Sequence, residues 1–263
     1  MSLAETNAAS PLSLSVKGLS KAFGGVQAVN DVSFDVAEGE LLALIGPNGA
    51  GKSTCFNMLN GQIRPDKGSV KLSGEELVGL SPAAVWRRGV GRTFQITATF
   101  PSMTVVENVA MVLMSQGREL FSFTKSAINR HRGKAMELLE LVGMAAQADR
   151  PCGVLAYGDL KRVELAVALG NDPRILLMDE PTAGMAPRER VELMGLAARF
   201  AHDFGVAVLF TEHDMDIVFG HADRIIVLSR GELIAEGNAE QIRNDPLVLK
   251  TYLGEGQIYG RQE

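Results

Sequence analysis

Residues 41–54 read LLALIGPNGAGKST, and this stretch decides the fold. The first five residues are all apolar, as expected of a β-strand that is buried on both faces. The nine that follow fit the pattern G-x-x-x-x-G-K-[ST], in which a glycine-rich backbone wraps around phosphates and leads into a helix. The alternative, an ordinary strand-to-helix turn with a fortuitous lysine, is disfavoured by the strand before it. The sequence therefore predicts a phosphate-binding loop made of Gly46, Pro47, Asn48, Gly49, Ala50, Gly51, Lys52, Ser53 and Thr54.

Two side chains of this loop have distinct expected roles. Lys52 would place a positive charge against the β- and γ-phosphates, and the hydroxyl of Ser53 would reach Mg²⁺. The helix that begins near Lys52 would add the positive end of its dipole. These features predict a P-loop nucleotide-binding core.

Two later apolar runs, residues 175–178 and 206–210, end in polar residues and predict further strands of a parallel sheet. Asp179 would hold Mg²⁺ through water, and Glu180 would orient the attacking water or accept its proton. The alternative is that these two acids simply end a strand. His213 follows the second run, where it could hydrogen-bond the γ-phosphate and the water, although a lone histidine is more often structural.

The rest of the chain suggests one domain with an insertion. Alternating apolar residues before residue 90 predict an N-terminal antiparallel β subdomain, helical patterns dominate from about 96 to 165, and residues 225–236 read as a hairpin. We expect an α/β fold with a mostly parallel sheet and an inserted helical subdomain. The expected divisions are a single domain over 10–255, a nucleotide-binding core over 12–95 and 166–237, a helical subdomain over about 96–165, and a helical tail over 238–263.

Composition limits the possible partners and the compartment. The net charge of −5 argues against a general nucleic-acid-binding protein, and the basic cluster Arg130–Lys134 reads as a solvated helix end. Cys55 and Cys152 suggest neither a disulfide framework nor a metal site, which suits a reducing compartment. The sequence shows no secretory signal and no apolar run of about 18 residues. We therefore expect a cytoplasmic protein that reaches a membrane only through a partner.

Together these residues resemble the ATP-binding subunits of ABC transporters, in the right order along nearly the whole chain. Gly91–Gln95 looks like the Q-loop, Leu155–Asp159 like the signature motif, Ala183–Ala186 like the D-loop and His213 like the H-loop. The resemblance implies binding and hydrolysis of ATP with Mg²⁺, with Gln95 contacting the metal and the water. It also places Phe23 where the family stacks an aromatic ring on adenine, although Phe23 could instead be a core residue.

In this family the signature of one subunit closes over ATP bound to the other. The resemblance therefore assigns Ala156, Tyr157, Gly158 and Asp159 to ATP binding in trans. It implies a second ATPase subunit, identical or similar, together with membrane permease subunits and, indirectly, a substrate-binding protein. The implied location is peripheral, on the cytoplasmic face of the inner (plasma) membrane, with no nucleic-acid partner.

Within the superfamily the sequence more closely resembles the branched-chain amino-acid type importer ATPases. The stretches that carry this similarity are Phe23–Gly25, Ala28–Ser33, Thr104–Val109, Leu155–Gly158, Thr211–Met215 and Tyr252–Gly254. Amide, urea or aromatic-acid import and lipopolysaccharide export remain open alternatives. A soluble ABC ATPase without a transport role, or a P-loop kinase, fits less well.

Two positions depart from the family pattern. The signature usually ends in glutamine where this chain has Asp159, and the D-loop commonly has Asp or Asn where this chain has Ala186. A carboxylate in the first turn would favour the helix but would oppose a γ-phosphate. We therefore hypothesise that this signature closes its composite site less effectively than that of a partner subunit.

Overall fold

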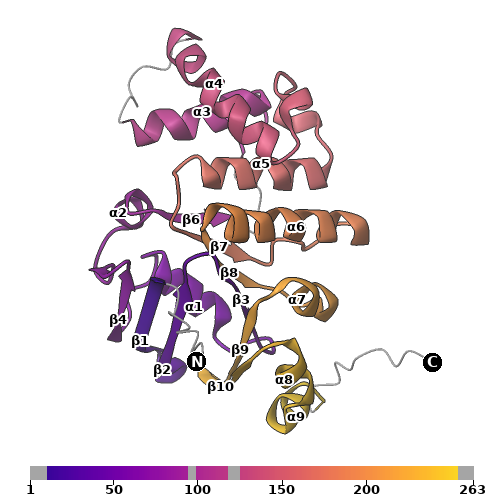
Figure 1. The fold of residues 1–263 in the computed structure, drawn as a ribbon. Coiled ribbons are helices and arrows are strands. Elements are labelled where there is room, and N and C mark those ends of the chain that lie inside the picture. Colours follow the sequence, from indigo (N-terminus) through magenta and orange to yellow (C-terminus); the bar gives the residue numbers. More distant parts are fainter. Residues whose placement is uncertain (1–10, 94–98, 118–124, 254–263) are drawn as a thin grey trace, which may run out of the picture.

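The computed structural model describes residues 11–93, 99–117 and 125–253, which are layered around a six-stranded sheet (Figure 1). Along this sheet the strands follow the order β10-β9-β3-β8-β7-β6. They are β3 (Leu41–Ile45), β6 (Val90–Thr93), β7 (Ile175–Asp179), β8 (Ala207–Thr211), β9 (Arg224–Ser229) and β10 (Glu232–Gly237). Only the β9–β10 pairing is antiparallel, so the mostly parallel sheet and the hairpin near residues 225–236 are confirmed.

A second sheet comes from the N-terminal part of the chain. Its order is β2-β1-β4-β5, and all its pairings are antiparallel. The strands are β1 (Leu12–Phe23), β2 (Val26–Ala37), β4 (Lys67–Leu72) and β5 (Glu75–Glu76). Leu14 pairs with Leu72 and Val16 with Val70, and all four are buried. The alternation in the sequence thus produces one buried face, as predicted.

The helices occupy both faces of the six-stranded sheet and the end of the chain. They are α1 (Lys52–Leu59), α2 (Pro82–Arg87), α3 (Val105–Gln116), α4 (Lys125–Leu141), α5 (Tyr157–Leu169), α6 (Pro187–Phe204), α7 (Met215–His221), α8 (Ala239–Asn244) and α9 (Pro246–Leu253), with short 3-10 turns at Ala145–Gln147 and Cys152–Val154. In Figure 1, α3, α4 and α5 lie beyond α6, away from the N-terminal sheet. Helix α5 runs across residues 165 and 166 without a break, so the proposed boundary falls inside an element and the domain division stays a prediction. None of the helices in the described ranges has both the length and the apolar character needed to cross a membrane.

The core has two halves, one on each face of the six-stranded sheet. Leu41, Ala43 and Ile45 of β3 face the half that contains α3, α4, α5 and α6. Leu42 and Leu44 face the half that contains α1 and the N-terminal sheet. Because successive side chains of a strand point to opposite faces, a fully apolar β3 serves both halves at once.

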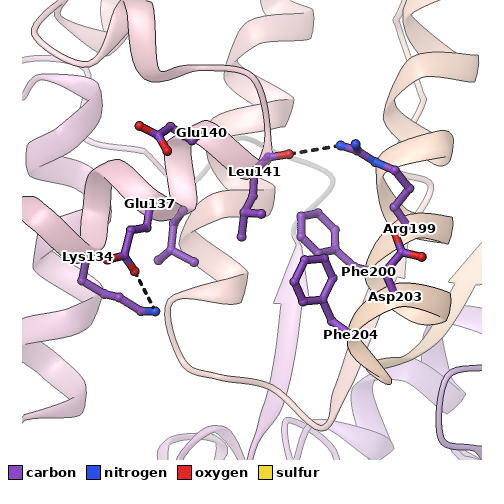
Figure 2. A pocket seen from close by; sticks show the side chains of 9 residues that line it. Lys134, Glu137, Glu140, Leu141, Arg199, Phe200, Asp203 and Phe204 are labelled. Carbon is purple, nitrogen blue, oxygen red and sulfur yellow. Dashed lines mark hydrogen bonds and ion pairs between the residues drawn. The ribbon is translucent and has the colours of Figure 1, made fainter.

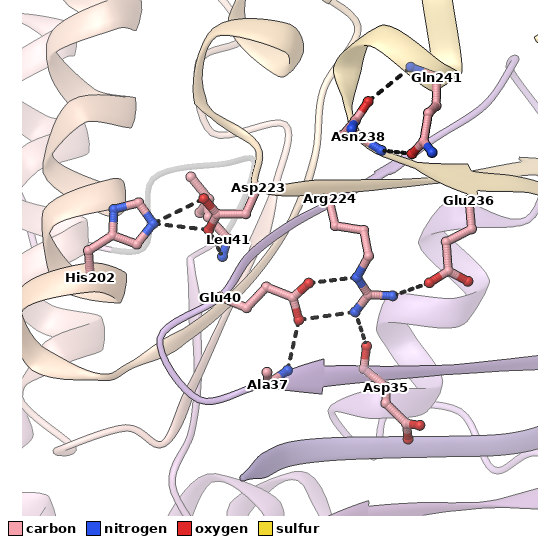
Figure 3. A network of polar contacts seen from close by, with 10 residues as sticks. All are labelled: Asp35, Ala37, Glu40, Leu41, His202, Asp223, Arg224, Glu236, Asn238 and Gln241. Carbon is pink, nitrogen blue, oxygen red and sulfur yellow. Dashed lines mark hydrogen bonds and ion pairs between the residues drawn. The ribbon is translucent and has the colours of Figure 1, made fainter. Parts of the chain in front are cut away.

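A polar cluster joins the two sheets at the start of β9 (Figure 3). The guanidinium of Arg224 donates from Nε to Glu40 Oε1 at 2.7 Å and from Nη2 to Glu40 Oε2 at 3.0 Å. It also donates to the backbone oxygen of Asp35 on β2 and to Glu236 on β10. The hydrogen bond with Glu40 raises the pKa of Arg224, although burial opposes this. Nearby, Asp223 accepts the N–H of Leu41, so this cluster fixes where β3 begins.

Candidate functional site

The predicted site residues follow the carboxyl ends of adjacent parallel strands. β8 lies between β3 and β7, and β6 pairs with β7 on the other side. The phosphate loop follows β3, His213 lies just after β8, Asp179 ends β7, and Glu180 follows it. Ligands of open parallel sheets bind along this edge. Gln95 follows β6 in sequence and lies outside the described residues.

The glycines of the loop are required by close backbone approaches. A Cβ on Gly46 would lie 2.1 Å from the backbone oxygen of Leu228 on β9. A Cβ on Gly51, where φ is +106°, would lie 2.4 Å from the backbone oxygen of Ala28 on β2. At φ near +106° a residue with a Cβ is also strained. These two glycines let the loop fit between the two sheets.

Helix α1 begins without a side-chain cap. Its N-cap residue is Gly51, and its first helical hydrogen bond runs from Cys55 N to Gly51 O. The N–H groups of the first turn therefore have no partner within the helix, which is the arrangement that binds phosphates. Lys52 is only 7% exposed, and its Nζ donates to Gly46 O at 2.6 Å and to Pro47 O at 3.0 Å. Elsewhere in the loop, Asn48, Gly49 and Ser53 are exposed, Gly51 and Thr54 are half-buried, and Gly46, Pro47 and Ala50 are buried.

The carboxylate of Asp179 is held on both sides. Thr211 Oγ1 on β8 donates to its Oδ1 at 2.8 Å, and Arg92 Nη2 on β6 lies 3.5 Å from its Oδ2. The same guanidinium donates to Asn57 Oδ1 on α1 at 3.0 Å. Burial lowers the pKa of Arg92, and the charge of Asp179 opposes this shift. Arg92 and Thr211 lie within the quoted stretches Gly91–Gln95 and Thr211–Met215, but their contacts with Asp179 could not be read from the sequence.

Glu180 and His213 meet across the ends of β7 and β8. His213 Nε2 lies 2.9 Å from Glu180 Oε1. An ionised carboxylate can only accept, so this contact requires a proton on Nε2 of the imidazole. Glu180 is also a non-glycine residue at φ +48°, a conformation that costs free energy and often marks functional sites. The two residues predicted to act on water are therefore brought together.

The buried Glu212 lies beside this pair and was missed by sequence reasoning. Its carboxylate accepts from the backbone N–H and the hydroxyl of Thr182 and from the N–H of His213. The one feature of the sequence that could have pointed to Glu212 is its position at a strand end, immediately before the predicted site residue His213. The sequence does not show which segment lies opposite it.

The predicted signature residues lie on the other face of the sheet from α1. Ala156 and Tyr157 are exposed, and Asp159 lies in the first turn of α5, as predicted. Gly158 is buried so closely against Glu189 that a Cβ there would lie 2.7 Å from its Oε1. Further along α5, Val163 and Ala166 are buried and Leu160 and Val167 are half-buried.

Phe23 ends β1 and is 47% exposed, so it is not a core residue. The ammonium of Lys21 lies 5.6 Å from the centre of its ring. The ring thus has an accessible aromatic surface, as a stacking role would require.

A separate hollow lies between α4 and α6 (Figure 2). Its walls include Leu141, Phe200 and Phe204, and Arg199 Nη2 donates to the backbone oxygen of Leu141 at 3.3 Å. None of the predicted site residues lines it. It is therefore not part of the site at the sheet edge.

Comparisons with known proteins agree with this geometry. Residues 29–183 match the family model described as ABC transporter, and residues 232–257 match that described as Branched-chain amino acid ATP-binding cassette transporter. The chain is 43% identical to the high-affinity branched-chain amino acid transport ATP-binding protein BraF of Pseudomonas aeruginosa, over 92% of this chain and 98% of that protein.

Two solved structures share the fold. One is the ADP conformation of MJ1267, an ATP-binding cassette of an ABC transporter, with a TM-score of 0.81 and 30% identity over 92% of this chain and 99% of that one. The other is a dimeric post-hydrolysis state of the ATP-binding cassette MJ0796 bound to ADP and Pi, with a TM-score of 0.73 and 26% identity over 86% and 98%. The chain belongs to the ATP-binding proteins of ABC transporters, in the group that includes the branched-chain amino acid transport ATP-binding proteins.

Proposed function

We propose that this chain is the ATP-hydrolysing subunit of an ABC importer for branched-chain or other amino acids. The observation that carries the proposal is the arrangement along one sheet edge of the glycine loop after β3, the Glu180–His213 pair and Asp179. The similarity to BraF supports the substrate class.

ATP is bound mainly by the phosphate loop. The uncapped N–H groups at the start of α1 bind phosphate oxygens, and Lys52 supplies a positive charge to the β- and γ-phosphates. Phe23, half-exposed at the end of β1, stacks on the adenine. The backbone of Gly46–Thr54 thereby positions the γ-phosphate for attack.

The residues at the sheet edge also fit Mg²⁺. Among the described residues, no group of three or more His, Cys, Asp or Glu side chains could hold a metal by itself. Mg²⁺ is usually bound by one or two protein oxygens together with substrate phosphates, and Ser53, Asp179 and Gln95 would supply these oxygens. Mg²⁺ neutralises charge on the transferred phosphoryl group.

Water is activated by Glu180. Its Oε1 contacts the Nε2–H of His213, and its carboxylate orients the water and accepts its proton. His213 donates its Nε2–H to the carboxylate and thereby holds it in place. Lys52 stabilises the negative charge that develops during attack.

Two ATP-binding subunits work together in this proposal. The dimeric cassette bound to ADP and Pi supports a pair of cassettes as the hydrolysing unit. Ala156, Tyr157, Gly158 and Asp159 then face ATP on the second subunit, which is identical or similar to this chain. The pair lies on the cytoplasmic face of the inner membrane and drives permease subunits, to which a binding protein delivers the substrate.

The Glu180→Gln variant tests the proposal. Removing the base should lower ATP hydrolysis by about 10²–10⁴-fold, while ATP binding stays close to that of the wild type. The exposed Glu38→Gln change is the matched control and should leave both unchanged. Cells carrying Glu180→Gln as their only copy should also lose uptake of labelled leucine. Full hydrolysis by Glu180→Gln would contradict the assignment of the base, and normal leucine uptake would contradict leucine as a substrate of the transporter.

A further inference from the structure

Residues 211–213, at and just after the end of β8, form hydrogen bonds with residues 179–182, at and just after the end of β7. Thr211 donates its hydroxyl to Asp179, and the N–H of Glu180 donates to the backbone oxygen of Thr211 at 3.1 Å and to its Oγ1 at 3.0 Å. His213 contacts Glu180, and Glu212 contacts Thr182. The strained backbone at Glu180 is therefore held from β8 by hydrogen bonds.

Glu212 is the most buried acid in this group. Its side chain is 5% exposed, and Thr182, its partner, is 1% exposed. Oε1 accepts the N–H of Thr182 at 2.8 Å and its hydroxyl at 2.7 Å, and Oε2 accepts the N–H of His213 at 3.2 Å. A buried carboxylate is costly unless its oxygens are hydrogen-bonded, and these three donors meet that requirement while tying Glu212 to Thr182 and His213.

These bonds close a ring around the catalytic pair. Glu180 connects through Pro181 to Thr182, Thr182 donates to Glu212, and Glu212 holds the N–H of His213. His213 then returns to Glu180 through the 2.9 Å side-chain contact. All the remaining links of the ring are covalent bonds or hydrogen bonds. The hydrogen bonds of Glu212 therefore limit how far His213 and Glu180 can move apart.

We propose that Glu212 and Thr182 are positioning residues for ATP hydrolysis, acting through the geometry of the Glu180–His213 pair. This inference rests on the proposed function. It assigns Glu212 no contact with ATP, so it predicts an effect on kcat with little effect on nucleotide binding. A displacement of about 1 Å at reacting groups can cost about a hundredfold in rate.

The test uses the full chain in its transporter complex, with kcat expressed per bound ATP so that unfolded protein is not counted. Glu212→Gln keeps the shape and an oxygen for Thr182, but its amide nitrogen would meet the N–H of His213 as donor against donor. We expect its kcat to fall by about tenfold to a hundredfold, with a KM for ATP within about twofold of the wild type.

Thr182→Val and Thr182→Ser form a matched pair that removes or keeps one hydroxyl. We expect Thr182→Val to lower kcat by about three- to tenfold and Thr182→Ser to retain the wild-type value within about twofold. If Glu212 acts through His213, then adding Glu212→Gln to His213→Ala should cost little more than His213→Ala alone. A purely structural role would instead give independent losses that multiply.

Two results would overturn the inference. Wild-type kcat in Glu212→Gln, with hydrolysis lost in Glu180→Gln, would refute it and leave the proposed function standing. Hydrolysis that survives Glu180→Gln would refute this inference together with the assignment of Glu180 as the base, because the ring would then hold no catalytic pair.

Discussion

Replacing Arg224 by Met tests whether the polar cluster of Figure 3 fixes the position of the strand that leads to the phosphate loop. The substitution keeps much of the side-chain length but removes both hydrogen bonds to Glu40, the bond to the backbone oxygen of Asp35 and the bond to Glu236. Glu40 is 13% exposed in the structure, and within the cluster it would then keep only the N–H of Ala37 as a donor (Figure 3).

The cost follows from this burial. Hydrogen bonds to charged groups contribute about 1.5–3 kcal/mol each, and removing one member of a buried ion pair costs about 3–5 kcal/mol. Because Arg224 is 27% exposed and water can replace part of what is lost, we expect the lower end, about 3 kcal/mol. For a chain of this size that is a fall in Tm of about 6–12 °C.

The assay is thermal or urea unfolding of Arg224→Met beside Glu236→Gln. The second variant removes charge from a partner that is 52% exposed, so we expect a cost below about 1 kcal/mol. A Tm for Arg224→Met within about 2 °C of the wild type would refute the reasoning. So would an equal cost for the two variants.

Three further predictions follow from single positions. Gly46→Ala should weaken ATP binding by at least about tenfold in calorimetry, because the new Cβ meets Leu228 O, whereas Gly195→Ala, with open space around it, should bind normally. Asp159→Gln should raise the ATPase rate of the assembled transporter, because a negative charge near the γ-phosphate is removed, and an unchanged rate would contradict the hypothesis for the signature. Burial raises the pKa of the Cys55 thiol to about 12. The stability contributed by the buried, protonated thiol is therefore full below pH 9 and is lost as the pH rises towards 12. A thiol reagent at pH 8 should label Cys55 only after urea is added.

The sequence predicted the central strands well but missed β6. Residues 41–45, 175–178 and 206–210 are apolar at nearly every position, which buried parallel strands require. β6 reads Val90-Gly91-Arg92-Thr93 and carries a charged residue whose partner, Asp179, lies on another strand. Its strand character comes from pairing with β7 at the sheet edge, and a local apolar pattern does not reveal such pairing.

Candidate site residues could be predicted where a chemically suitable residue type stands at the end of a strand, and their catalytic roles stay predictions. Asp179, Glu180 and His213 are of this kind. Glu212 is not, because its role depends on Thr182 lying opposite it, and that contact arises only when β7 and β8 pair. A residue that positions a catalytic side chain can be identified only from its contacts, and those contacts form in the tertiary structure.

The two departures from the family pattern, Asp159 and Ala186, lie close to the same side chain, that of Glu189. Glu189 accepts the N–H of Ala186 at 3.0 Å, and its carboxylate packs against Gly158, the neighbour of Asp159. The sequence separates the signature from the D-loop, but the structure joins them through this one acid. The negative charge at the signature therefore has two sources, Asp159 in the first turn of α5 and Glu189 from α6. The repulsion between a carboxylate and a γ-phosphate depends on the distance between them and on how deeply they are buried. Asp159 alone therefore does not determine the electrostatic potential of this surface.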